Sequence, residues 1–510
     1  MANWFARGMG VVLNLVLIPI LFRKLPSQEL GIWFLLGQSW TVIGFFDFGF
    51  ASIFSRKVAF ALESGSREAS IAQSREAVIS QLFATCHVLN RWLAVFAFVV
   101  SLISGAIYLG KLDLVEVNRM SAWAAWSVLC LARAVAIWSS TWASLLRGLG
   151  YVGWDTVLGA LVNAAILTGQ AVCVWLGGGL VALAIVAGVG AVTQRWLVTR
   201  FIRRRCSALN LERGRWDSGC FRSMLPFALR GWITSLGHLL LAATDQFFVT
   251  SYKGASALPA YRAAFILSIN LHLLAGVFSG AAPLFVSRLW RSGELGQIRS
   301  ILKRNAQIGL FSMACGSATI LCLGPTLFDV WLGPGNFIGY PVLGIFLATF
   351  VLEHHANVFS TCSRATNDEA YAIWSVAAGI IKVILALVLM RRFGLAGLAL
   401  STLLAQGLTT DWFMVYRSGI RLAVDYEAHV RQVVIPFFSV LATASAIAAT
   451  VNALTSAQPA GIRLPAVVFS ALVTLAGSVW LVILRPADRA CVLKTIGSLT
   501  SKHCIALVRR

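Results

Sequence analysis

The sequence is 510 residues long, 58% hydrophobic and only 12% charged, with a mean hydropathy of +0.79. A soluble domain is roughly 45–50% apolar and about 25% charged, so these values exclude soluble enzymes, disordered proteins, fibres and secreted disulfide scaffolds. The net charge is +22, but Lys and Arg also collect in the cytoplasmic loops of membrane proteins and beside anionic headgroups, so we predict no nucleic-acid partner.

The hydropathy pattern predicts fourteen spans, each with about the 20 mostly apolar residues that a helix needs to cross a bilayer. In chain order the predicted spans are 4–22, 32–54, 83–109, 120–146, 154–176, 178–199, 224–250, 257–285, 304–324, 338–360, 371–390, 394–416, 433–453 and 464–484. The predicted fold class is an all-α polytopic membrane protein with two six-helix lobes and two C-terminal helices.

Basic residues concentrate in alternate loops. The loop after the sixth span carries Arg200, Arg203, Arg204 and Arg205, and the tail after residue 484 is also basic, whereas the loops on the other side carry few bases. Because short cytoplasmic loops are enriched in Lys and Arg, we expect both termini to face the cytoplasm.

The two halves of the sequence resemble each other weakly. Residues 28–33 are followed by an apolar span and then by Ser55 and Arg56, and residues 255–261 are followed by an apolar span and then by Ser287 and Arg288. Repeated halves with a site between them are a common transporter plan. The predicted parts are an N-terminal lobe at 1–199, a basic cytoplasmic connector at 200–223, a C-terminal lobe at 224–416, two accessory spans at 417–484 and a basic cytoplasmic tail at 485–510.

Ionisable and polar residues inside the predicted spans are the first candidates for a functional site, because they are costly in hydrocarbon and usually face a bundle interior or an aqueous cavity. On the seventh span, Arg230, Thr234, His238 and Asp245 recur at spacings of 4, 4 and 7 and so share one helical face. The other polar candidates for the cavity are Asn163, Gln170 and Gln406.

The predicted interior holds more bases than acids, which favours an anionic guest such as a phosphate or diphosphate, since Arg can bind it through two hydrogen bonds. The candidate substrate-binding cations are Arg133, Arg230, Arg262 and Lys382.

Three acids within the spans are candidates for ion coupling or gating: Asp47, Asp245 and Glu353. Asp245 and Arg262 both lie near the outer ends of their spans, so a structural ion pair between them is the alternative. Asp47 is equally suited to bonding a neighbouring helix end.

The sequence lacks the marks of cofactor chemistry. Its ten cysteines include no CxxC pair, the adjacent His354 and His355 lack the i, i+4 spacing of a helical zinc pair, and no phosphate-binding P-loop is present. We therefore expect no metal site, no cofactor, no disulfide framework and no built-in ATPase.

Several short patterns resemble the polysaccharide transporter (Wzx-type flippase) family of the MOP exporter superfamily. In the first half they are Leu13-Asn14-Leu15 through Pro19, Arg23-Lys24-Leu25, Glu29-Leu30-Gly31-Ile32-Trp33 and Phe46-Asp47-Phe48-Gly49-Phe50; in the second they are Thr244-Asp245-Gln246, Ala260-Tyr261 and Pro283.

The resemblance implies a multi-pass protein of the bacterial inner membrane. It also implies a flippase that moves an undecaprenyl-diphosphate-linked oligosaccharide to the outer leaflet for O-antigen, exopolysaccharide or capsule assembly, by alternating access of two lobes around a cationic cavity. The implied partners are this polyprenyl-diphosphate-linked oligosaccharide, membrane lipids and other glycan assembly proteins such as a polymerase or a chain-length regulator.

Three alternatives remain at this stage. A MATE-like multidrug antiporter would need buried acids in excess of buried bases. A membrane glycan polymerase or acyltransferase would need a long outer loop with catalytic residues, and no such loop is predicted. A scaffold for a glycan assembly complex would be indifferent to neutralisation of the interior charges.

Overall fold

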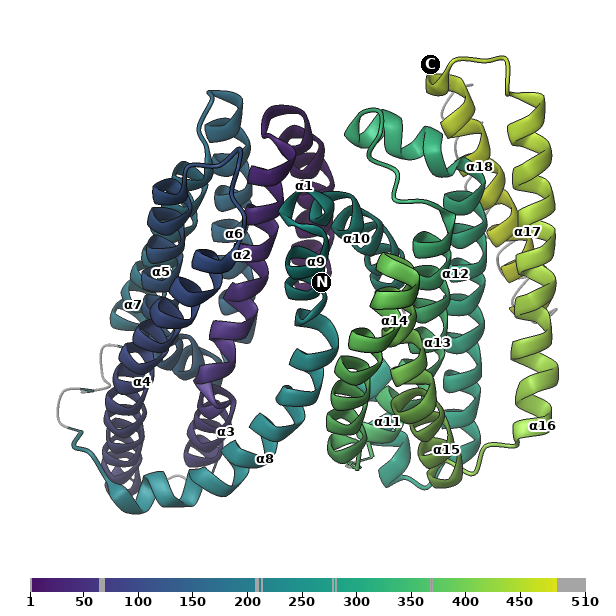
Figure 1. The fold of residues 1–510 in the computed structure, drawn as a ribbon. Helices are drawn as coiled ribbons and strands as arrows, with labels where there is room; N and C mark the ends of the chain where they lie inside the picture. The colour runs from purple at the N-terminus through teal and green to yellow at the C-terminus, as the bar shows by residue number, and fades with distance from the viewer. Residues whose placement is uncertain are drawn as a thin grey trace, which may run out of the picture. The chain divides into compact units, whose positions relative to one another are not determined.

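A computed structural model describes residues 2–63, 69–206, 211, 214–277, 279, 282–366, 368 and 370–483. These residues form helices joined by short connections, with no strand among them, which confirms the predicted all-α class (Figure 1). In hydrocarbon a helix satisfies all its backbone hydrogen bonds within one segment. The predicted tail at 485–510 lies outside the described residues.

The helices are named here in chain order. In the first half they are α1 (Ala2–Lys24), α2 (Ser27–Gly44), the 3-10 turn η1 (Phe45–Asp47), α3 (Phe50–Glu63), α4 (Ala69–Lys111), α5 (Arg119–Gly148), α6 (Val152–Trp175) and α7 (Leu180–Arg205). In the second half they are α8 (Ser218–Ala243), α9 (Asp245–Lys253), η3 (Ala255–Ala257), α10 (Leu258–Ala275), α11 (Ala282–Arg291), α12 (Leu295–Leu332), α13 (Tyr340–Arg364), α14 (Ala372–Gln406), the π-helical η5 (Gly407–Asp411), α15 (Trp412–Arg421), α16 (Tyr426–His429), the π-helical η6 (Val430–Val434), α17 (Ile435–Leu454), α18 (Ala460–Ser478) and the π-helical η7 (Val479–Ile483).

Ten helical stretches of the described chain are long and apolar enough to cross a membrane. One of them, Ala372–Arg421, covers two of the predicted spans, and Gly394 interrupts it with a φ of 58°. The protein is therefore a multi-pass membrane protein, while the count of fourteen spans stays a prediction.

The chain divides into two compact units. The first comprises Met1–Ala263, Trp331–Asn336 and Ala372–Ser401. Within it α5 packs against α4 and α7, and α6 packs against α1 and α7. A buried cluster that includes Phe54, Leu145 and Ile202 fills its core. The predicted five-part division of the chain stays a prediction.

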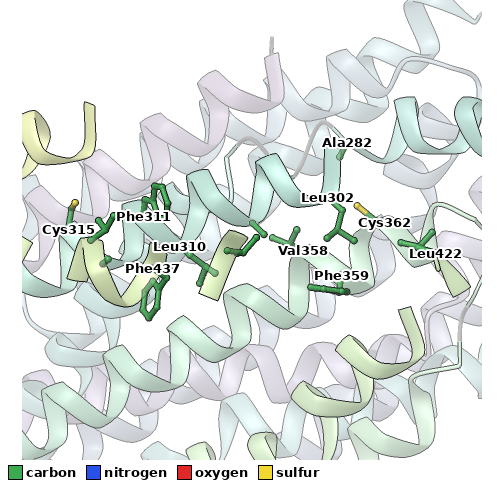
Figure 2. Packing of buried hydrophobic residues seen from close by; sticks show 14 of the residues in the cluster. Ala282, Leu302, Leu310, Phe311, Cys315, Val358, Phe359, Cys362, Leu422 and Phe437 are labelled. Carbon is green, nitrogen blue, oxygen red and sulfur yellow. The ribbon is translucent and has the colours of Figure 1, made fainter. Parts of the chain in front are cut away.

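The second unit comprises Ala264–Val330, Phe337–Tyr371 and Thr402–Arg510. Its core lies between α11, α12, α13 and α17, where Phe311, Phe359 and Phe437 pack with smaller aliphatic residues (Figure 2). Phe311 and Phe359 are fully buried.

The predicted span at 32–54 is wrong as a single helix. Helix α2 ends at Gly44, and after η1 the chain turns through Phe48 and Gly49, with φ values of 51° and 72°, before α3 begins. Gly49 adopts this left-handed backbone without steric cost. The turn places Asp47 at a helix break rather than within a continuous span.

The predicted spans at 224–250 and 257–285 also differ from the structure. The first is divided at Thr244 into α8 and α9, and α10 ends at Ala275. At the first break the Thr244 hydroxyl donates to the carbonyl of Leu240 at 2.7 Å, and the Lys382 ammonium donates to the same carbonyl. Side chains therefore satisfy a backbone acceptor at the break.

Candidate functional site

A cavity of about 350 Å³ lies inside the first unit, between α2, α5, α6 and α7. We call it the Arg133 cavity. Each helix contributes a stripe of residues at spacings of three and four, which is one face of a helix. Helix α2 contributes Trp33, Gly37 and Trp40, and α5 contributes Leu129, Arg133 and Ala136.

Helices α6 and α7 supply the amides of the cavity. Helix α6 contributes Gly159, Val162, Asn163, Ile166 and Gln170, and α7 contributes Ala187, Ala191 and Gln194. The small residues on these stripes leave space between the helices, and none of the described lining residues is acidic. The structure thus brings together three residues that the sequence indicated separately: Arg133, Asn163 and Gln170.

Arg133 is half-buried, and its Cζ lies 5.2 Å from the centre of the Trp40 ring. This is the geometry of a cation–π contact. Its buried Nε has no hydrogen-bond partner, and no acid in the described part of the chain forms an ion pair with it. A guanidinium with a buried, unused donor is able to bind an anion.

Gly44 sets the position of this guanidinium. A methyl group on Gly44 would lie 1.9 Å from Nη2 of Arg133, which is a severe overlap, although the backbone itself tolerates Ala because Gly44 is helical. We expect Gly44→Ala to push the guanidinium out of the cavity and to reduce transport roughly tenfold or more, since small displacements of a binding group are costly.

The control for this prediction is Gly153→Ala, at a glycine of α6 where an added methyl group meets nothing within 4 Å. Both variants are compared for transport per amount of inserted protein. Equal transport by the two variants would contradict the assigned position of Arg133.

Asp47 is half-buried in η1, and its Oδ1 is buried with no hydrogen-bond partner. Arg133 and Arg147 both act on it electrostatically. Asp47 is therefore near the Arg133 cavity without lining it, and its coupling or gating role stays a prediction.

Asp245 lies at the start of α9 and forms a buried ion pair with Lys382 of α14. The Tyr261 hydroxyl donates to Asp245 Oδ2 at 2.8 Å, and Lys382 also donates to the Thr244 hydroxyl and to the Leu240 carbonyl. Lys382 is fully buried, with an exposed fraction of 0%. Its ammonium therefore has one ion pair and two hydrogen bonds within the protein.

This cluster bears on two sequence-based predictions. Asp245 forms an ion pair with Lys382, which was not predicted as its partner, and the predicted partner Arg262 on α10 also acts electrostatically with Asp245. Lys382 was predicted to bind substrate; here its ammonium is buried and contacts Asp245, Thr244 and Leu240, and its binding role stays a prediction. The position of Asp245 near the outer end of its span indicated Arg262 as a partner but gave no sign of Lys382.

Three predicted residues of the seventh span cannot be placed in the site. The backbone of Arg230, Thr234 and His238 belongs to α8, but their side chains lie outside the described part of the structure. Their predicted roles stay predictions.

The remaining predicted residues lie in the second unit. Glu353 on α13 is half-buried and acts electrostatically on Asp411 of η5. Gln406 at the end of α14 is also half-buried, and its Oε1 has no hydrogen-bond partner. His355 contacts His429, with 2.9 Å between their Nε2 atoms.

Sequence analysis missed Trp33, Trp40 and Gln194. The two Trp residues read as ordinary apolar residues of a span, and Gln194 adjoins the more conspicuous Arg195. Their spacing could have identified the two Trp residues. Trp33, Gly37 and Trp40 are four and three residues apart and so lie on one helical face, where the glycine leaves a gap.

No protein-family model matches the sequence, and no curated protein matches it. Solved structures do match. A structure described as the lipid II flippase MurJ in an inward closed conformation has a TM-score of 0.69 and 14% sequence identity, and the match covers 94% of this chain and 99% of that one.

Two further solved structures are similar. An inward-facing multidrug resistance transporter of the MATE family in the MOP superfamily has a TM-score of 0.64 and 12% identity, over 81% of this chain and 94% of its own. A MOP superfamily transporter from Pyrococcus furiosus, described as having a binding pocket of reverse polarity that suggests a different function, has a TM-score of 0.54 and 12% identity, over 83% and 94%. At these identities the likeness establishes the fold alone, which this chain shares with these three structures.

Proposed function

We propose that the protein is a flippase, not an enzyme, and that it moves a polyprenyl-diphosphate-linked oligosaccharide from the cytoplasmic to the outer leaflet of a bacterial inner membrane by alternating access. The observation that carries the proposal is the Arg133 cavity. It combines Arg133, which forms no ion pair among the described residues, with two tryptophans and three amides.

The chemistry of the lining matches such a headgroup. A guanidinium binds phosphate oxygens through two parallel hydrogen bonds. The apolar faces of Trp33 and Trp40 offer surface to the apolar face of a sugar ring, and the amides of Asn163, Gln170 and Gln194 can each donate to and accept from sugar hydroxyls. An uncharged sugar would not require the cation, and a simple anion would not require the tryptophans.

The structural neighbours include a flippase and MATE transporters, so the charge of the cavity is what favours this proposal over the main alternative. One neighbour is described as a flippase of lipid II, and another description connects the polarity of the binding pocket with function. A MATE-like multidrug antiporter for organic cations would place acids in the cavity. The described lining of the Arg133 cavity has a cation in their place.

The proposal further assigns the protein to O-antigen, exopolysaccharide or capsule assembly, with both termini in the cytoplasm. The test is deletion of the gene in the native host, followed by extraction of lipid-linked oligosaccharides and assay of surface glycan. We expect surface glycan to be lost and diphosphate-linked intermediates to accumulate on the inner leaflet. Unchanged glycan together with increased sensitivity to cationic compounds would instead support the antiporter.

A further inference from the structure

A second cavity of about 350 Å³ lies on the pair formed by α6 and α7. We call it the outer furrow. Its lining is aliphatic except for Gly190 and Thr193, and no charged side chain contributes to it among the described residues. Three of its residues, Leu161, Ile185 and Val189, are 57%, 49% and 60% exposed. Since α6 and α7 are apolar enough to cross a membrane, such exposed aliphatic residues face hydrocarbon.

The outer furrow and the Arg133 cavity share part of their walls. Val162 and Ile166 line both of them. On α6 the neighbouring Asn163 belongs to the polar cavity, whereas Leu161 and Ala165 belong to the furrow. Two aliphatic side chains one helical turn apart therefore lie between a polar cavity and a surface that faces lipid.

The contact between the two helices at this point depends on a glycine. A methyl group on Gly190 would lie 2.3 Å from Cδ1 of Ile166, so only a residue without a side chain leaves room for this isoleucine. Neither Val162 nor Ile166 has a hydrogen-bonding side chain that would fix it.

A carrier of an amphiphilic lipid has to satisfy two opposite requirements. The charged headgroup cannot enter hydrocarbon without its polar partners, and exposure of the tail to water costs about 25 cal/mol per Å² of apolar surface. Both requirements are met where a polar cavity adjoins a furrow that faces lipid.

We propose that the outer furrow is the binding site for the hydrocarbon tail of the transported lipid while its headgroup occupies the Arg133 cavity, with Val162 and Ile166 in contact with both parts. This inference rests on the proposed function. It commits to the isoprenoid tail of the substrate, because only a lipid whose headgroup fits the neighbouring Arg133 cavity is held at this place.

The test uses photo-crosslinking with the full chain in liposomes and ³²P-labelled undecaprenyl diphosphate as the probe. Val189 in the furrow is replaced by p-benzoylphenylalanine, and Val192 on the same helix is the matched control, since it is 55% exposed and does not line the furrow. A second pair on α6 is Leu161 in the furrow and Val172 outside it, which is 49% exposed. We expect labelling to be several times stronger at Val189 and Leu161 than at their controls, and to fall to the control level with Arg133→Ala.

Equilibrium binding of the same probe separates the two proposals. Saturable, Arg133-dependent binding with equal labelling at furrow and control positions would overturn the tail site and leave the proposed function intact. Absence of saturable binding would count against the proposed function itself. Labelling of the furrow that persists unchanged with Arg133→Ala would mean that any membrane lipid occupies it, which also overturns the tail site.

Discussion

Replacing Arg133 with Ala is expected to abolish transport of the lipid-linked oligosaccharide while the protein remains folded and inserted. The reason is that Arg133 is the only cation among the described lining residues of the cavity, and it forms no ion pair in the described part of the chain, where Asp47 acts on it from a longer distance. The measurement is surface glycan and inner-leaflet lipid-linked oligosaccharide in a deletion host complemented with the variant. A loss of about 2–3 kcal/mol of charge-assisted hydrogen bonding corresponds to a reduction in headgroup affinity of roughly 30-fold or more.

The matched control is Arg195→Ala. Arg195 on α7 also lies over an indole, with its Cζ 3.4 Å from the centre of the Trp138 ring, but it does not line the Arg133 cavity. We expect this variant to transport normally when corrected for the amount of folded protein. Arg133→Lys keeps the charge without the planar fork, so it should transport at an intermediate rate. Normal transport by Arg133→Ala would remove this residue from the substrate site.

The helical spans were predictable because their signal is local. A run of about 20 apolar residues indicates a span without knowledge of its neighbours, and the all-α class followed from it. The breaks were not predictable, because they depend on contacts between distant residues. At Thr244 the carbonyl of Leu240 is bonded by Lys382, which lies more than a hundred residues further along the chain.

The candidate site shows the same division between local and distant information. Arg133, Asn163 and Gln170 were found because polar residues within a span are rare and costly. These three residues line one cavity because of the way α2, α5, α6 and α7 pack together. The sequence of a single helix does not specify this packing. Lys382 shows why this signal is ambiguous, since a cation within a span can pair with a buried acid as well as with a substrate.

The second large effect is expected at that ion pair. Lys382→Met should destabilise the protein by about 3–5 kcal/mol, because it leaves the Asp245 carboxylate buried with the Tyr261 hydroxyl but without the Lys382 ammonium that pairs with it. Asp245→Asn should cost a similar amount, since it leaves the ammonium of a fully buried lysine without its counter-charge. Thermal unfolding of the purified variants in one detergent measures both effects.

The double variant Asp245→Asn with Lys382→Met then separates a structural pair from a functional one. It removes the charges of Asp245 and Lys382 together, and its amide still accepts the hydrogen of Tyr261, so part of the lost stability should return, although Arg262 still loses the carboxylate that acts on it. If the double variant loses as much stability as the two single variants lose together, this result would contradict the pairing. If the double variant is stable and transports normally, the pair belongs to the architecture of the helix break. A stable double variant that fails to transport would instead restore Lys382 or Asp245 to the binding or coupling role that the sequence predicted.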